Sequence, residues 1–258
     1  MTNEWQGMHD LAVRLAREAG DFAVAQLDAD NGIRGKGENG DVVTLVDQEA
    51  ERRIIEEIQA AYPDHAILGE ESGLIGDDDA PVRWLVDPLD GTNNYVMGMP
   101  MFGVCLTVLE DGVPVAAVVH ESVRGISTSA IRGKGAWRNG RPLHLGEPAP
   151  LSRATISWTQ GYGVTFDDPF RRHVIHTLEP RIKRLLGTWS PSIDWGLIAA
   201  GHVGAFVAYR NERWDLVGGA MIVEEAGGAI YWSPDAALDC VIAGHPETVA
   251  ALRELLGV

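Results

Sequence analysis

The stretch WLVDPLDGT, residues 84–92, joins an apolar strand to a turn that carries two aspartates. Apolar residues directly precede Asp87, so we expect Asp87 to end a buried strand, and Pro88 stiffens the backbone that follows. Asp90 comes three residues later, close enough for both carboxylates to touch one ion, and we expect the Leu89 carbonyl to point into the same space. Carboxylates this close repel each other unless a cation neutralises them. The stretch therefore predicts a cation site at the end of a strand.

The donor atoms of this stretch indicate which ion and which chemistry to expect. Oxygen ligands with no Cys or His nearby suit Mg²⁺ or Mn²⁺ better than zinc. Gly91 and Thr92 add backbone N–H groups at a predicted helix start, where a phosphate group can bind. A D-x-x-D turn taken alone is commonly only a polar turn. Combined with a phosphate site, it indicates metal-assisted transfer of a phosphoryl group to water.

Three further acidic segments stand at the ends of predicted elements. GEES, residues 69–72, follows a predicted strand, and WD, residues 214–215, opens a predicted helix that leads into EEAGG at 224–228. DVVTLVD, residues 41–47, leads into another predicted helix. Helix capping alone would explain GEES or WD. Because strand ends and helix starts are where folds present function, the four segments together indicate one site.

Hydrophobic spacing predicts an α+β first half and an α/β second half. We expect helices at 5–28, 46–61, 167–178, 193–200, 215–226 and 247–256. We expect strands at 66–68, 83–86, 103–109, 113–120, 126–131, 154–158, 184–186, 205–208, 229–232 and 241–243, with hairpin turns at Asp111-Gly112 and Asn139-Gly140. No flexible linker stands near 140–150, so we expect a single domain over 1–258, with subdomains of about 1–145 and 146–258.

Composition excludes several classes of protein. The chain has 258 residues, of which 45% are hydrophobic and 22% charged, which is ordinary globular usage. The longest apolar runs are far short of the ~20 residues that cross a bilayer, so no membrane partner is expected. A net charge of −16 disfavours a nucleic-acid polymer but allows small phosphorylated substrates beside a bound metal. Two cysteines are too few for a disulfide scaffold, and no signal peptide is visible, so a cytoplasmic location is expected.

The segments DPLDGTNNY at 87–95 and WD at 214–215 with EAGG at 225–228 resemble the two signature segments of the inositol monophosphatase family. GEES at 69–72 is similar to a third metal-ligand motif of that family. The resemblance covers nearly the whole chain. It implies the layered αβαβα sandwich of the sugar phosphatases, an α+β / α/β fold. It also implies a Mg²⁺-dependent phosphomonoesterase for a small phosphorylated metabolite, working as a homodimer.

The resemblance also implies a set of metal ligands. Glu70, Asp87 and the Leu89 carbonyl would hold a first Mg²⁺, and Asp87, Asp90 and Asp215 a second. A third, weaker Mg²⁺ would contact Glu70 through water. Two or three ions per active site are therefore expected, and Mn²⁺ could replace Mg²⁺.

Catalytic and substrate-binding roles follow from the same resemblance. Thr92, hydrogen-bonded to Asp47, would activate a water for in-line attack on phosphorus, with Glu70 beside it. The N–H groups of Gly91 and Thr92 would hold the phosphate oxygens. Asp90 and Asp215, at the second metal, would also contact the substrate.

The chain departs from the family where the leaving group is expected to bind. Inositol-specific members have a glutamate seven residues before the metal aspartate, and here that position is Ala208. The nearest acid is Glu212, and Glu212 or Asp194 could replace the missing carboxylate if either lies in the pocket. The segment GTWSPS at 187–192 places Trp189 where relatives have small residues, so Trp189 is either a substrate contact or a packing residue.

These departures leave the substrate open among several phosphomonoesters. The favoured reading is a phosphorylated polyol or sugar resembling inositol 1-phosphate. The alternatives are histidinol phosphate, fructose 1,6-bisphosphate and nucleotide 3′-phosphates, or a non-catalytic binding protein on the same fold. Haloacid-dehalogenase phosphatases also carry an Asp-x-Asp-Gly-Thr string, but their aspartates are two residues apart and these are three.

Overall fold

The structure is a computed structural model that describes residues 2–27, 29, 32–36 and 41–258. The helices are α1 (Thr2–Ala25), α2 (Leu45–Ala61), α3 (Thr92–Val96), α4 (Pro169–Leu178), α5 (Pro191–Ala199), α6 (Arg213–Glu225) and α7 (Pro246–Leu256), with a 3₁₀ turn at Leu151–Arg153. The first strands are β1 (Arg34–Lys36), β2 (Asp41–Val43), β3 (Ala66–Gly69), β4 (Gly73–Ile75), β5 (Val82–Asp90), β6 (Gly103–Glu110), β7 (Val113–Glu121) and β8 (Ile126–Ile131). The remaining strands are β9 (Gly135–Arg138), β10 (Arg141–Leu143), β11 (Thr155–Gln160), β12 (Arg184–Leu186), β13 (Ala205–Tyr209), β14 (Ala229–Trp232) and β15 (Cys240–Gly244).

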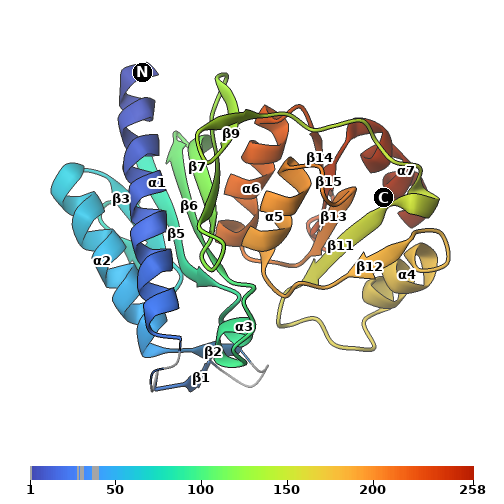
Figure 1. Ribbon diagram of the computed structural model, residues 1–258, viewed down its shortest axis with the longest axis horizontal. Coiled ribbons are helices and arrows are strands. Elements are labelled where there is room, and N and C mark those ends of the chain that lie inside the picture. The colour runs from blue at the N-terminus through green and yellow to red at the C-terminus, as the bar shows by residue number, and fades with distance from the viewer. Residues whose placement is uncertain (1, 28, 30–31, 37–40) are drawn as a thin grey trace.

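Two large sheets and three sets of helices form five layers (Figure 1). Helices α1 and α2 cover the outer face of an eight-stranded sheet of order β10-β9-β8-β7-β6-β5-β3-β4. Helices α5 and α6 lie between that sheet and a five-stranded sheet of order β12-β11-β13-β15-β14, and α4 and α7 cover its far face. The αβαβα sandwich that the resemblance implied is confirmed.

Three apolar clusters hold these layers together, and the second of them lies on both sides of the central helices α5 and α6. The first packs α1 and α2 on the large sheet and includes the fully buried Trp84. The second surrounds Trp195 and Phe206 between the two sheets, and the third packs α4 and α7 on the small sheet. Because α5 and α6 have sheets on both sides, they are apolar on most faces rather than amphipathic.

Most predicted elements are present, and both predicted hairpin turns are confirmed. Asp111 and Gly112 have φ angles of 50° and 77°, and Asn139 and Gly140 have 48° and 75°. Positive φ at both central residues is what a two-residue hairpin with a type I′ turn requires. The α/β description of the second half needs refinement, since β11, β12 and β13 run parallel but β15 is antiparallel to both its neighbours.

Several elements are absent from the prediction. The short strands β1, β2, β4, β9 and β10 have three or four residues each, too few to show an alternation of apolar and polar side chains. Strand β5 continues through Asp90, beyond the predicted end at residue 86. No helix in the described part of the chain combines the length and hydropathy that a bilayer-spanning segment needs.

Candidate active site

Strand β5 carries the two aspartates of the DPLD turn, and an irregularity in its pairing turns both to one face. Asp87 pairs with Cys105 of β6 and Asp90 with Gly103, so three steps along β5 match two steps along β6. The extra residue is a β-bulge next to Pro88, which has no N–H to give to the ladder. Residues three apart on a regular strand point to opposite faces. The bulge removes that difference, so both carboxylates face the layer of α5 and α6.

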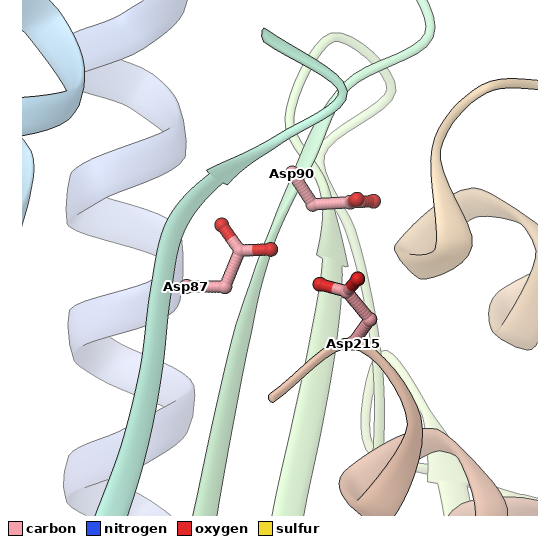
Figure 2. Close-up of side chains that lie close together, drawn as sticks. All are labelled: Asp87, Asp90 and Asp215. Atoms are coloured by element: carbon pink, nitrogen blue, oxygen red, sulfur yellow. The ribbon is translucent and has the colours of Figure 1, made fainter. Parts of the chain in front are cut away.

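Asp215 completes a cluster of three carboxylates (Figure 2). It stands in the first turn of α6, where the Trp195 indole donates a 2.7 Å hydrogen bond to its backbone carbonyl. One carboxylate oxygen from each of Asp87, Asp90 and Asp215 lies within 4.8 Å of the others. These three residues, which we call the carboxylate cluster, come from segments more than 120 residues apart in the sequence.

The electrostatics of the carboxylate cluster favour a bound cation. Burial, and then the neighbouring carboxylates, raise the pKa of Asp87 and of Asp215 well above the ordinary value. Burial raises the pKa of Asp90 to about 6, although hydrogen bonds from Ser190 and Ser192 favour its charged form. A divalent cation would remove both the repulsion and the desolvation cost. The oxygen-only donor set fits Mg²⁺ or Mn²⁺.

Glu70 lies beside the carboxylate cluster but is not part of it. Its backbone N–H donates a 3.1 Å hydrogen bond to the Val86 carbonyl, which holds the GEES segment against β5. Its negative charge contributes to the raised pKa of Asp87, of Asp90 and of Asp215. The N–H of the next residue, Glu71, donates to the side chain of the buried Glu51. The role of Glu70 as a metal ligand stays a prediction.

Thr92 and Asp47 form a buried pair behind the carboxylate cluster. The Thr92 hydroxyl lies 2.9 Å from both Asp47 Oδ1 and the Leu89 carbonyl oxygen. Asp47 is fixed by a capping box, because its other oxygen accepts from the Thr44 N–H at 2.9 Å and from the Thr44 hydroxyl. Burial raises the pKa of Asp47 to about 6. The arrangement can therefore accept a proton through the threonine hydroxyl.

Gly91 sits where no other residue fits easily. Its φ is +86°, and a Cβ there would lie 2.9 Å from the Met101 carbonyl oxygen and 3.0 Å from Ser190. It precedes the short helix α3, so the N–H groups of Gly91 and Thr92 stand at the end of β5 beside Asp90. This is the position expected for a phosphate group.

A cleft of about 610 Å³ opens over these groups. Eight of the predicted site residues line it: Glu70, Asp87, Leu89, Asp90, Gly91, Thr92, Trp189 and Asp215. Asp47 is fully buried behind Thr92. Ala208 is 1% exposed, packs in the apolar cluster around Trp195 and Phe206, and is not among the described residues that line the cleft. Its substrate-binding role stays a prediction, one that this placement does not favour.

Of the two acids that could replace the missing carboxylate, only one lies in the cleft. Glu212 lines it, whereas Asp194 is fully buried below it, hydrogen-bonded to Ser157 and Thr188. Tyr162, Arg210 and Asn211 come from the loops after β11 and β13. These loops follow neighbouring parallel strands, and their carboxyl ends meet at one edge of the sheet. That topology is the signal that could have found them.

Comparison with known proteins agrees with this geometry. The family model described as the inositol monophosphatase family matches residues 4–241. A fructose-1,6-bisphosphatase/inositol-1-monophosphatase of Thermotoga maritima is 33% identical, over 86% of this chain and 83% of that protein. The Nus factor SuhB of Escherichia coli K12 is also 33% identical, over 95% of this chain and 94% of that protein.

Solved structures give the same result. The extragenic suppressor protein suhB of Bartonella henselae superposes with a TM-score of 0.90 at 26% identity, covering 97% of this chain and 98% of that one. An IMPase of Thermotoga maritima gives a TM-score of 0.83 at 30% identity, covering 96% and 97%. The chain belongs to the inositol monophosphatase family. It is a phosphatase, and the family to which it belongs is metal-dependent.

Proposed function

We propose that this chain is a Mg²⁺-dependent phosphomonoesterase that hydrolyses a small phosphorylated alcohol by direct attack of water. The observation that carries the proposal is the carboxylate cluster of Asp87, Asp90 and Asp215, which lines the cleft together with Gly91. Asp87, Asp90 and Asp215 would hold one ion, and Glu70, Asp87 and the Leu89 carbonyl the other. Mg²⁺ bound there would supply charge neutralisation and lower the pKa of a water next to phosphorus.

The protein's own groups provide the rest of the mechanism. The N–H groups of Gly91 and Thr92 bind the phosphate oxygens and orient the phosphorus atom toward the carboxylate cluster. The Thr92 hydroxyl passes a proton from the attacking water toward Asp47, whose pKa of about 6 suits an acceptor near neutral pH. As the water oxygen bonds to phosphorus, the bond from phosphorus to the alcohol oxygen breaks, and the leaving oxygen takes a proton from solvent. The leaving alcohol occupies the part of the cleft formed by Trp189, Glu212 and Tyr162. No group of the protein needs to form a covalent phosphoenzyme.

Phosphate release is the test. The protein is stripped with a chelator and assayed on a range of phosphomonoesters, then assayed again with Mg²⁺, Mn²⁺ or Ca²⁺. Mg²⁺ should restore activity, Mn²⁺ should support part of it, and added Ca²⁺ should inhibit because its larger and looser coordination misplaces the water. Full activity in chelator contradicts the proposed mechanism.

We further propose a small metabolite as substrate and no nucleic-acid ligand. The net charge of −16 repels a phosphate backbone.

A cytoplasmic location is proposed as well. Cys105 and Cys240 are both buried and unpaired, in keeping with a reducing cytoplasm. The family resemblance adds the proposal of a homodimer, which light scattering on the purified protein would test.

A further inference from the structure

The backbone at Trp189 adopts a conformation that residues other than glycine rarely take. Its φ is +59°, in the left-handed region. Such a conformation persists only where the surrounding structure imposes it, and it is most frequent at functional sites. Trp189 combines this conformation with a position that lines the cleft.

Hydrogen bonds on both sides of Trp189 impose this conformation. Before it, the buried Thr188 donates from its hydroxyl to Asp194 at 2.6 Å, and the Asn94 amide donates to the Thr188 carbonyl at 2.7 Å. After it, the buried Ser190 donates from its hydroxyl to Asp90 at 2.6 Å. Both flanking residues are therefore tied to buried partners, one of them in the carboxylate cluster.

Trp189 is only about half covered by packing. Trp189 is 49% exposed, while Thr188 and Ser190 are 2% and 0% exposed. A tryptophan that served the core would be buried like Trp195, which is fully covered. The backbone of Trp189 is strained, and about half of this residue is exposed at the cleft.

A second exposed aromatic ring lines the same cleft. Tyr162 is 42% exposed, and its hydroxyl oxygen lies 2.8 Å from the Asn93 amide nitrogen, one residue after Thr92. Its neighbour Gly161 packs so closely that a Cβ there would lie 1.9 Å from the Arg210 carbonyl oxygen. The loop carrying Tyr162 is thus fixed against the loop carrying Arg210 and Glu212. Trp189 and Tyr162 therefore line one cleft from two different loops.

We propose that Trp189 and Tyr162 form an aromatic subsite that binds a flat heterocyclic ring of the leaving alcohol. The proposal rests on the phosphatase function proposed above and names its substrate class: a phosphomonoester of an alcohol that bears an aromatic heterocycle. A nucleoside or an imidazolyl alcohol supplies that chemistry. Glu212 lies in the same cleft and accepts a hydrogen bond from a hydroxyl of the alcohol. Aromatic rings bind heterocycles by stacking, largely regardless of which heterocycle is present.

The kinetic test compares substrates that share the phosphate and differ in the ring. We would measure kcat/KM for adenosine 3′-monophosphate, for an imidazolylalkyl phosphate and for glycerol 2-phosphate. The wild-type protein should prefer at least one ring-bearing substrate over glycerol 2-phosphate by about 10-fold or more, in line with the size of stacking effects on bases. The two ring-bearing substrates distinguish a nucleoside from an imidazolyl alcohol.

Variants of Trp189 then test the subsite. Trp189→Gly keeps the backbone unstrained and should lower the preference ratio by about 10-fold, while Trp189→Phe, which keeps a ring, should restore most of it. Trp232 is the matched control, because it is exposed to a similar extent, 46%, and is not among the described residues lining the cleft. Trp232→Gly should leave the ratio as it is. A wild-type ratio below about 3-fold for both ring-bearing substrates, or a ratio unchanged in Trp189→Gly, overturns the proposal.

A binding measurement separates this proposal from the phosphatase function. Adenosine without phosphate should quench tryptophan fluorescence of the metal-free wild-type protein, and Trp189→Gly should lose that quenching while Trp232→Gly keeps it. If no phosphomonoester is hydrolysed but quenching is seen, the phosphatase proposal fails and the aromatic subsite stands. If glycerol 2-phosphate is hydrolysed as well as the ring-bearing substrates and no quenching occurs, the aromatic subsite fails and the phosphatase stands.

Discussion

The hydroxyl of Ser190 donates a 2.6 Å hydrogen bond to Oδ2 of Asp90, a residue 100 positions earlier in the chain. The Ser192 N–H donates to the same oxygen at 2.6 Å. The start of α5 is therefore bonded directly to the carboxylate cluster. As a result, the segment that shapes the leaving-group side of the cleft also holds a predicted metal ligand in place.

Ser190→Ala should weaken metal binding more than it weakens the fold. Loss of this hydroxyl leaves the charged form of Asp90 with one fewer donor, so its pKa should rise and its affinity for Mg²⁺ should fall. We expect about a 10-fold higher Mg²⁺ concentration at half-maximal activity, measured by titrating the stripped protein. Ser152→Ala, on the exposed 3₁₀ turn, is the control. An unchanged Mg²⁺ titration would show that the Ser192 N–H alone positions Asp90.

The acidic ligands should differ sharply in importance. Asp90→Asn removes charge from the carboxylate cluster and should lower kcat by at least ~10³-fold. Glu70→Gln should also be severe, because Glu70 lies close enough to act on all three cluster carboxylates. Glu71→Gln should have little effect. Equal damage from Glu70→Gln and Glu71→Gln, in steady-state kinetics at saturating Mg²⁺, would mean that the ligand within this pair is wrongly assigned.

The metal-free protein should gain stability as the pH falls. Burial raises the folded-state pKa of Asp47 and of Asp90 to about 6 and that of Asp194 to about 8, above the unfolded value of roughly 3.9. A raised folded pKa means that the folded state binds protons more tightly. This stability is therefore fully present below about pH 4 and is lost as pH rises toward about 8.

Thermal unfolding in chelator and in Mg²⁺ measures this linkage. In chelator, Tm should rise between about pH 8 and pH 5, and Asp194→Asn should flatten the upper part of that slope. Mg²⁺ should stabilise most at the higher pH, where the carboxylates are free to bind it. If Tm in chelator falls steadily as the pH is lowered from about 8 to 5, these carboxyl groups do not have raised pKa values in the folded state.

We expect Glu212, and not position 208, to provide the contact with a substrate hydroxyl. The sequence suggests that Ala208→Glu would restore a hydroxyl contact, but Ala208 is packed in the core. A carboxylate there would be desolvated, so we expect a loss of about 3 kcal/mol or more in the free energy of unfolding and no gain in activity. Glu212→Gln should instead raise KM for hydroxyl-rich phosphomonoesters by about 10-fold, with a smaller effect on kcat. Denaturant unfolding and KM measurements together decide between the two positions.

Much of the fold was predictable because the long elements repeat their pattern over enough residues. Helix α2 and strands β6 to β8 begin and end within about two residues of the predicted positions. The carboxylate cluster was predictable from motif chemistry, since Asp87, Asp90 and Asp215 stand in recognisable segments. The loops after β11 and β13 were not, because neither Tyr162 nor Arg210 belongs to a pattern and only the parallel pairing of these strands brings them together. Ala208 is buried because helices cover both faces of β13, so that every residue of this strand is buried, and that is set by tertiary packing.

The bulge in β5 gives the number of residues between the two aspartates a geometric meaning. On an unbroken strand, carboxylates must be two residues apart to share a face, which is the D-x-D spacing of a different class of phosphatase. Here the spacing is three, and the surplus residue is absorbed beside Pro88 where the pairing with β6 slips. Deleting one residue of the pair Pro88-Leu89 would therefore not simply shorten the turn. It would produce either a regular strand with D-x-D spacing, or a strand that keeps its bulge and turns Asp90 away from Asp215. The three-residue spacing between Asp87 and Asp90 therefore implies a bulge that turns both side chains to the same face of the strand.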